Sequence, residues 1–204
     1  MLQSWIDGKE PANMGNEQNI ALIKFVNEIN MSPFAAGISA KDSLTTIDKF
    51  WEEMRNRQGS LMKIRNDKHS KKEGILKVID ETICQITKEV ERLSSKKKAE
   101  HWKVDNMNRI LSPSDIGRHN MLEEGSNYYF IDFEYSGLDD LAKLMADWMY
   151  SPNAIQRCHR YECIQKVCET RIGRNKHWQK RLYDIKMLTN CKWIEIMTRK
   201  WANQ

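Results

Sequence analysis

Apolar residues recur at steps of three and four along most of the chain, the spacing of amphipathic helices. The first such pattern runs from Glu17 to Ile29. A second begins at Asp42-Ser43 and is followed by predicted loop positions at Gly59-Ser60 and Asn66-Asp67. The buried side of this second helix is predicted to consist of Leu44, Ile47, Phe50, Trp51 and Met54.

The clearest helical pattern follows Ser70, which is a plausible N-cap. Its apolar stripe consists of Ile75, Ile79, Ile83, Ile86, Val90 and Leu93. Lysine, aspartate and glutamate fill much of the space between these positions. Such a helix could form a coiled-coil arm. Because the heptad-like run is short and other predicted helices surround it, we expect it to pack against the body of a helical domain.

The pattern changes between residues 108 and 135. Short apolar pieces at 109–111 and 120–122 are followed by a predicted turn at 123–127. Tyr128–Phe133 is rich in residues that favour strands, so a strand is predicted there. The chain is therefore expected to be mainly α-helical with a small β-hairpin insert.

From Leu138 onward the chain is again predicted to be helical, up to Ser151-Pro152. The apolar stripe of this helix consists of Leu141, Leu144, Met145 and Trp148. Three further helices are expected at 153–172, 175–188 and 190–202, with a break at Gly173. Residues 1–15 contain Gly8, Pro11 and Gly15 and are expected to be extended or looped.

Composition narrows the class of protein. The chain has 204 residues, of which 40% are hydrophobic and 30% charged, the profile of one ordinary globular domain. No apolar run approaches the roughly 18 residues of a membrane span, and the N-terminus lacks the pattern of a secretory signal. A cytoplasmic protein without a membrane partner is therefore expected.

The cysteines agree with a reducing compartment. There are five, an odd number, and none forms a CxxC pair. Cys158, Cys163 and Cys168 recur every five residues, about 500° of helical rotation, so successive thiols do not share a face. This spacing disfavours a zinc site and favours reduced thiols.

The net charge of +5 raises the alternative of a nucleic-acid or anion partner. The aromatic residues are not interleaved with basic residues as in known RNA-binding patterns. Basic residues of this kind are more often solvated helix faces, so nucleic-acid binding is not expected.

Three polar residues between 111 and 135 suit phosphoryl transfer. Asp115 is followed five residues later by Asn120, and Asp132 ends the apolar run of the predicted strand. In phosphoryl transfer one carboxylate accepts the proton of the attacking hydroxyl, while an amide oxygen and a second carboxylate hold magnesium. Taken singly, each residue has a structural alternative: Asp115 starting a turn, Asn120 capping an element, and Asp132 ending a strand.

Two segments around these residues resemble the aminoglycoside phosphotransferase and choline kinase family, which has the protein-kinase-like fold. Ser112-Pro-Ser-Asp-Ile-Gly-Arg-His-Asn-Met-Leu122 is similar to the catalytic loop of a bacterial branch of that family. Phe130-Ile-Asp-Phe-Glu-Tyr-Ser-Gly-Leu-Asp-Asp140 is similar to its metal-binding segment. Trp5-Ile-Asp-Gly8 resembles the hinge between the two lobes, and Lys192-Trp-Ile-Glu-Ile-Met197 resembles the last helix.

The resemblance implies an ATP-dependent kinase that phosphorylates a hydroxyl of a small molecule. Asp115 would be the catalytic residue, and Asn120 and Asp132 would bind Mg²⁺ and, through it, the phosphates of ATP. Asp140 would be the acidic residue that buttresses the catalytic loop, and His119 a packing or hydrogen-bonding residue rather than a base.

The sequence departs from the family in two ways. Pro113 occupies a position where many members have histidine, which the similar branch tolerates. The chain also lacks the glycine-rich loop and strand lysine of the N-lobe. We therefore expect residues 1–15 to be a hinge or linker and 16–204 to be a helical C-lobe, with its site at 111–140 and the N-lobe absent.

Two functions remain open at this point. The chain is either a truncated kinase, with a separate N-lobe chain as a possible partner, or a catalytically inactive kinase-like binding module. The substrate is not specified by the sequence. Acidic residues on the helical lobe would favour a cationic substrate, but the pairs Glu52-Glu53 and Glu123-Glu124 are not obviously on that wall.

Overall fold

The structure is a computed structural model that describes residues 6–31, 38–67, 73–94, 102, 104, 108–152 and 160–202. Its helices are α1 (Asn16–Ile29), α2 (Ile47–Asn66), α3 (Glu73–Ser94), α4 (Leu141–Tyr150), α5 (Arg160–Glu169) and α6 (His177–Ala202). Its strands are β1 (Arg109–Ser112), β2 (Met121–Glu124), β3 (Asn127–Phe130) and β4 (Gly137–Asp140). The mainly α-helical prediction is confirmed for these residues.

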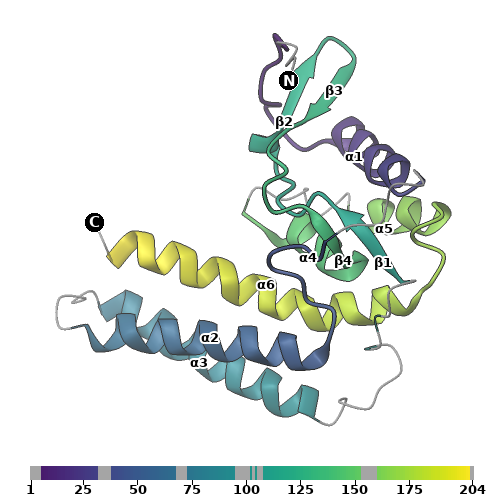
Figure 1. The fold of residues 1–204 in the computed structure, drawn as a ribbon. Coiled ribbons are helices and arrows are strands. Elements are labelled where there is room, and N and C mark those ends of the chain that lie inside the picture. The colour runs from purple at the N-terminus through teal and green to yellow at the C-terminus, as the bar shows by residue number, and fades with distance from the viewer. Residues whose placement is uncertain are drawn as a thin grey trace.

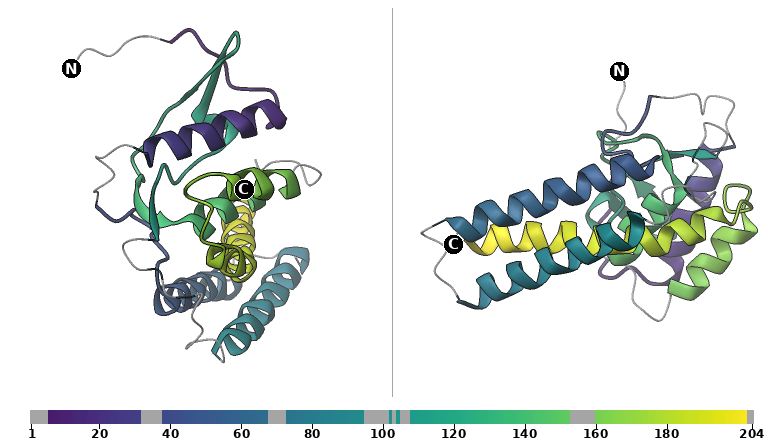
Figure 2. Two further views of the ribbon diagram at one scale, coloured as in Figure 1. Left: turned by 90° about the vertical axis from the view of Figure 1, so that its right-hand side faces the viewer. Right: turned by 90° about the horizontal axis from the view of Figure 1, so that it is seen from below.

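Helices α2, α3 and α6 lie side by side and form one half of the molecule (Figures 1 and 2). The stripe predicted for α3 is buried there, and Ile79, Ile86 and Leu93 are fully enclosed. This confirms that α3 packs against the helical body. Its predicted N-cap, Ser70, lies outside the described residues.

Helix α2 begins at Ile47, five residues later than the start predicted at Asp42. Thr46 is the N-cap, and its hydroxyl oxygen accepts a hydrogen bond from Lys49 N at 3.2 Å. The predicted loop at Gly59-Ser60 is wrong, because both residues lie inside α2. The buried face continues past them to Leu61, and packing against α3 and α6 outweighs the weak helix propensity of one glycine.

Helix α6 is continuous, so the predicted break between residues 188 and 190 is also wrong. Buried residues recur along it on the side that faces α2, α3 and α4, and no glycine or proline interrupts them. The break at Gly173 is confirmed. A side chain there would meet Val167 O at 1.9 Å, so only glycine allows the chain to fold back against α5 at this point.

The sheet formed by β1 and β4 was not predicted. The two strands are antiparallel, with Arg109 opposite Asp140 and Ser112 opposite Gly137. Residues 138–140 are therefore a strand and not the start of a helix. Helix α4 begins only at Leu141, where Asp140 acts as N-cap and accepts a hydrogen bond from Ala142 N at 3.1 Å.

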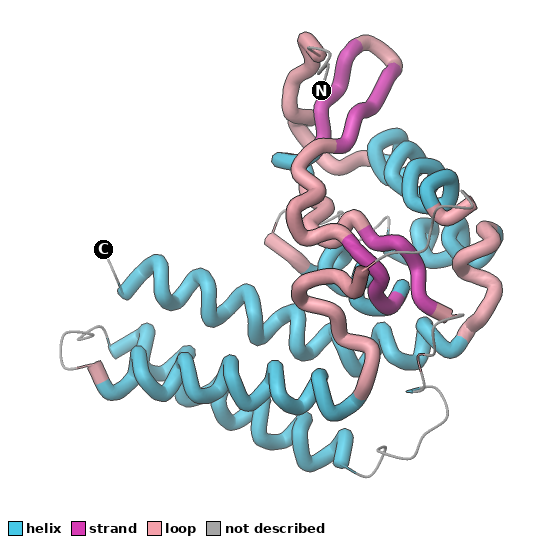
Figure 3. The backbone as a smooth tube through the Cα atoms, viewed as in Figure 1, coloured by secondary structure: helices cyan, strands magenta, loops and turns pink. Residues whose placement is uncertain are grey.

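The predicted hairpin is present as β2 and β3, joined by the two-residue loop Gly125-Ser126 (Figure 3). Gly125 has φ +62°, as the first loop position of a type II′ turn requires. Strand β3 ends at Phe130, so it is shorter than predicted and Asp132 lies beyond it. The segment before α1 runs alongside β2, where Lys9 and Glu123 exchange two backbone hydrogen bonds of 3.0 and 2.8 Å.

No helix within the described ranges is long and apolar enough to cross a bilayer.

The packing of α2 can be tested with two adjacent residues of similar size. Leu61 is fully buried between the helices, whereas Met62 is 44% exposed. We expect Leu61→Ala to lower the free energy of unfolding by about 2–5 kcal/mol, because it removes buried methyl groups and leaves a cavity. Met62→Ala, the control, should change it by less than about 1 kcal/mol. Urea denaturation measures both, and equal losses would contradict this packing.

Candidate functional site

Asn120 joins the two segments that the sequence singles out. It ends a 3₁₀ turn at Arg118–Asn120 and is almost fully buried. Its side-chain Nδ2 donates to the backbone oxygen of Asp115 at 2.8 Å. Its own backbone oxygen accepts from Ile131 N at 3.0 Å. Asn120 therefore connects the loop of Asp115 to the segment that contains Asp132, and we refer to this connection as the Asn120 joint.

The backbone on both sides of this joint adopts an uncommon conformation. Ser114 and Asp132 are the non-glycine residues of the described chain with positive φ, at +63° and +62°. Such conformations persist where the surrounding structure imposes them, and they concentrate at functional sites. At Ser114 the conformation is supported by a hydrogen bond from its N–H to the hydroxyl of Ser112 at 3.1 Å.

Asp115 is half exposed, and the nearest titratable partner given by the structure is His119. Its Oδ2 lies 3.4 Å from His119 Nε2. The His119 ring lies close to Gly117, where an added side chain would come within 2.6 Å of the ring. The glycine therefore makes room for His119 beside Asp115, in agreement with a hydrogen-bonding role for that histidine.

Aromatic stacking positions the segment that contains Asp132. Phe25 of α1 stacks on Phe130 with ring centres 4.4 Å apart and on Phe133 with ring centres 5.9 Å apart. These phenylalanines stand on either side of Asp132 in the sequence. Asp132 itself remains exposed, so the stacking fixes its backbone while leaving its carboxylate accessible.

Two adjacent aspartates connect this region to the helices. Asp140 is fully buried and receives two hydrogen bonds from Arg181 of α6, from Nε at 2.6 Å and from Nη2 at 2.7 Å. Asp139 accepts from Leu44 N at 3.1 Å and from Asp140 N at 2.8 Å. The buttress predicted at Asp140 thus acts on α4 and α6 directly, and on the Asp115 loop only through the β1–β4 pairing.

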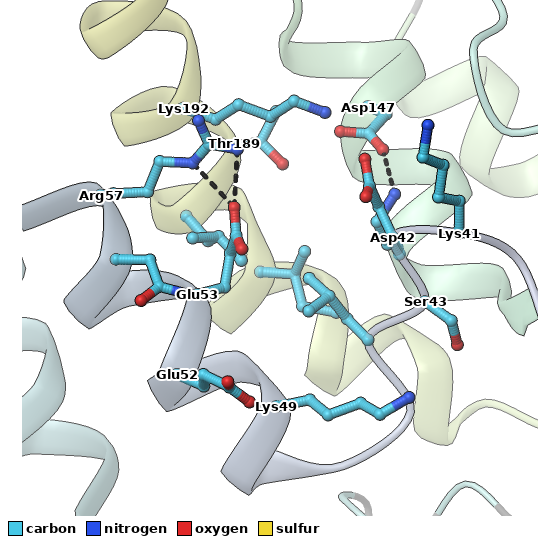
Figure 4. Close-up of a pocket in the computed structure, with 15 residues that line it drawn as sticks. Lys41, Asp42, Ser43, Lys49, Glu52, Glu53, Arg57, Asp147, Thr189 and Lys192 are labelled. Atoms are coloured by element: carbon cyan, nitrogen blue, oxygen red, sulfur yellow. Dashed lines mark hydrogen bonds and ion pairs between the residues drawn. The ribbon is translucent and has the colours of Figure 1, made fainter. Parts of the chain in front are cut away.

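Two adjoining cavities share part of their lining, and Asp115 borders one of them. One, of about 290 Å³, is bordered by Asp115, His119 and Tyr135 and reaches Trp193 of α6. The other, of about 260 Å³, lies between α2, α4 and α6, and Figure 4 shows its walls. The lining residues shared by the two cavities are Asp42, Lys143, Asp147 and Lys192. Together they form a polar space that leads away from Asp115.

Sequence reasoning missed most of this wall. Lys143 and Asp147 pair at 2.7 Å, although both lie on the otherwise apolar helix α4. The sequence did contain a signal for this pair, because two oppositely charged residues four positions apart on an apolar helix can form an ion pair. Burial alone would lower the pKa of Lys143, but the charges of Asp147 and Asp139 raise it, so the amine stays charged. The structure also places Glu52 and Glu53 on this wall, whereas Glu123 and Glu124 lie in β2.

The residues at the joint fit a magnesium ion that is shared with a nucleotide. The amide nitrogen of Asn120 is used by Asp115, which leaves an amide oxygen, and Asp132 offers a carboxylate. Magnesium prefers oxygen donors and commonly binds through one or two carboxylates together with phosphates and water. No group of three or more metal-binding acidic, histidine or cysteine side chains occurs in the described part of the chain, so a dedicated protein cage is not offered.

No protein-family model and no curated protein sequence matches this chain. Solved structures do match it. Choline kinase from Cryptosporidium parvum Iowa II superposes with a TM-score of 0.57 and 14% identity, over 98% of this chain and 66% of that one. A spectinomycin phosphotransferase in complex with ADP and spectinomycin superposes with a TM-score of 0.53 and 16% identity, over 96% of this chain and 70% of that one.

The chain shares the fold of these small-molecule kinases. The resemblance to the choline kinase and aminoglycoside phosphotransferase fold is therefore confirmed at the level of structure. At these identities the likeness establishes the fold and not the activity. This chain also spans only about two thirds of the length of the choline kinase chain.

The buried Asp139 generates a pH-dependence prediction. Burial raises its pKa from 3.8 to about 6, and the opposing effect of Lys143 is smaller. Between these two pH values the folded protein holds a proton that the unfolded chain has released. The free energy of unfolding should therefore fall as the pH rises through this window, by about 3 kcal/mol in total from this group.

We expect Asp139→Asn to remove this decrease, because the amide keeps the Oδ1 acceptor and does not ionise. Asp7→Asn, at an exposed carboxylate, should leave the pH dependence unchanged. Urea denaturation across the pH window measures both variants. An unchanged slope in Asp139→Asn would contradict the raised pKa.

Proposed function

We propose that this chain is the helical lobe of an ATP-dependent phosphotransferase that acts on a hydroxyl of a small molecule, similar to aminoglycoside phosphotransferases. The observation that supports it most is the joint at Asn120. One buried side chain holds the loop of Asp115, and its backbone holds the segment of Asp132. Phosphoryl transfer depends mainly on the positioning of such groups.

The proposed catalytic residue is Asp115. Its half-exposed carboxylate borders the cavity, so it could accept the proton of a substrate hydroxyl bound there. In the reaction the hydroxyl oxygen bonds to the terminal phosphorus of ATP while the bond from that phosphorus to ADP breaks. The developing charge would be neutralised by Mg²⁺, for which Asn120 and Asp132 are the proposed ligands.

The acceptor is proposed to bind in these two cavities, of which one borders Asp115. Their combined size suits a small molecule. Their walls contain both signs of charge, including Glu52, Glu53, Lys49 and Lys192. This mixture supports a polar acceptor that carries several hydrogen-bonding groups.

A lobe that covers the nucleotide would also be needed. The choline kinase and spectinomycin phosphotransferase chains extend beyond the part that this chain covers, which supports the proposal that it corresponds to their C-lobe. The covering lobe would come from the same polypeptide or from a separate chain. We place the protein in the cytoplasm, and the cysteines within the described ranges, all free thiols, agree with a reducing compartment.

The first test is a calorimetric titration of the purified protein with ATP in the presence of Mg²⁺. We expect Asp132→Ala to weaken binding at least about tenfold, because the phosphates lose their metal bridge. Asp115→Asn should bind ATP like the unmodified protein, because Asp115 acts on the acceptor. Glu124→Gln, which removes an exposed carboxylate from the hairpin, is the control and should have no effect.

The outcomes separate the proposal from its alternative. ATP binding that ignores Mg²⁺ or survives Asp132→Ala would contradict the proposed metal site. A folded protein that binds no ATP would favour the catalytically inactive binding module over a working nucleotide site.

A further inference from the structure

A second pocket lies at the end of β1 that is remote from Asp115. It has a volume of about 300 Å³ and is formed by the start of β1, the α5–α6 loop and the first turns of α6. Its charged residues, within the described part of the chain, are all arginines: Arg109, Arg171, Arg174 and Arg181. Its remaining polar residues are Asn30, Asn108, Asn175 and Trp178. No described carboxylate lines it.

The side chain of Arg181, which lines this pocket, is held in a fixed position. Its guanidinium forms two hydrogen bonds with the buried carboxylate of Asp140, so its charge is compensated within the protein. Trp178 is also fixed, because its indole Nε1 donates to Gly173 O at 3.1 Å. The pocket is therefore built on buried residues that are held in place by the fold.

The other three arginines form no ion pair with a described residue. Arg171 and Arg174 are exposed, and the structure gives neither an ion pair nor a side-chain hydrogen bond with a described residue. Arg109 has a buried Nε without a hydrogen-bond partner, and its one described side-chain contact is a long 3.5 Å hydrogen bond to Thr45. A buried donor left without an acceptor is unfavourable, so the unpaired Nε of Arg109 suggests that a ligand supplies the acceptor.

We propose that this pocket binds a small anion that carries more than one phosphate group. Guanidinium groups bind phosphate oxygens through paired hydrogen bonds, and several of them in one concave site favour a multiply charged ligand. The size of the pocket and the confinement of these arginines to one end of β1 favour a compact ligand over a nucleic-acid backbone, which needs an extended basic surface.

The site is separate from the one proposed for phosphoryl transfer. Arg109 begins β1 opposite Asp140, whereas the loop of Asp115 follows the other end of the same strand. The two sets of lining residues do not overlap within the described residues. The inference therefore stands or falls independently of the proposed kinase activity.

The test is a calorimetric titration with pyrophosphate in EDTA, so that no metal-dependent binding contributes. We expect saturable binding that the double variant Arg171→Gln/Arg174→Gln weakens at least about tenfold. Lys24→Gln/Lys88→Gln removes the same charge from exposed positions on α1 and α3 and should leave the affinity unchanged. Thermal melts confirm that both variants remain folded.

Three results would overturn the proposal. They are no pyrophosphate binding by the unmodified protein, equal weakening in the two double variants, and binding that survives the loss of Arg171 and Arg174. Tight, steeply salt-dependent binding of an RNA oligonucleotide, together with an absence of pyrophosphate binding, would assign the arginines to a nucleic acid instead.

Discussion

The buried ion pair between Asp140 and Arg181 is the interaction on which the arrangement of this molecule depends. Asp140 ends β4, caps α4 and binds α6 through both oxygens. Since β4 pairs with β1, the same residue also fixes the strand that leads into the loop of Asp115. Removal of one partner would leave an uncompensated buried charge, which typically costs about 3–5 kcal/mol. The position of the loop that contains Asp115 is therefore set by the helical core.

Asn120 fixes the backbone of the proposed site relative to this core. The loop of Asp115 and the segment of Asp132 come from different sides of the β2–β3 hairpin, and Asn120 bonds to both. Phe25 adds a second restraint from α1 by stacking on the phenylalanines around Asp132. Both carboxylates stay accessible while their backbones are fixed, which is the condition that electrostatic catalysis of phosphoryl transfer requires.

Much of the helical fold could be predicted from the sequence, because the spacing of apolar residues along single helices is a strong local signal. The apolar stripe of α3 predicted a helix that the structure confirms. The spacing of Asp115, Asn120 and Asp132 predicted a shared site, which stays a prediction; the structure shows that Asn120 bonds to Asp115 and to Ile131. The predictions of secondary structure were wrong where contacts between residues distant in the sequence determine the structure. Residues 138–140 are a strand because they pair with β1, and α2 continues through Gly59 because α3 and α6 cover its other face. Glu52 and Glu53 reach the cavity wall only through that helix packing.

The central claim is that Asp115, Asn120 and Asp132 form one metal–nucleotide site. Nuclear magnetic resonance of the ¹⁵N-labelled protein, titrated with Mn²⁺ and ADP, tests it most directly, because the paramagnetic ion broadens the amide signals nearest to it. We expect the signals of Asp115, Asn120 and Asp132 to broaden first and together. Earlier broadening at Glu52 and Glu53, or uniform broadening across the chain, would show that the metal binds elsewhere and would contradict the claim.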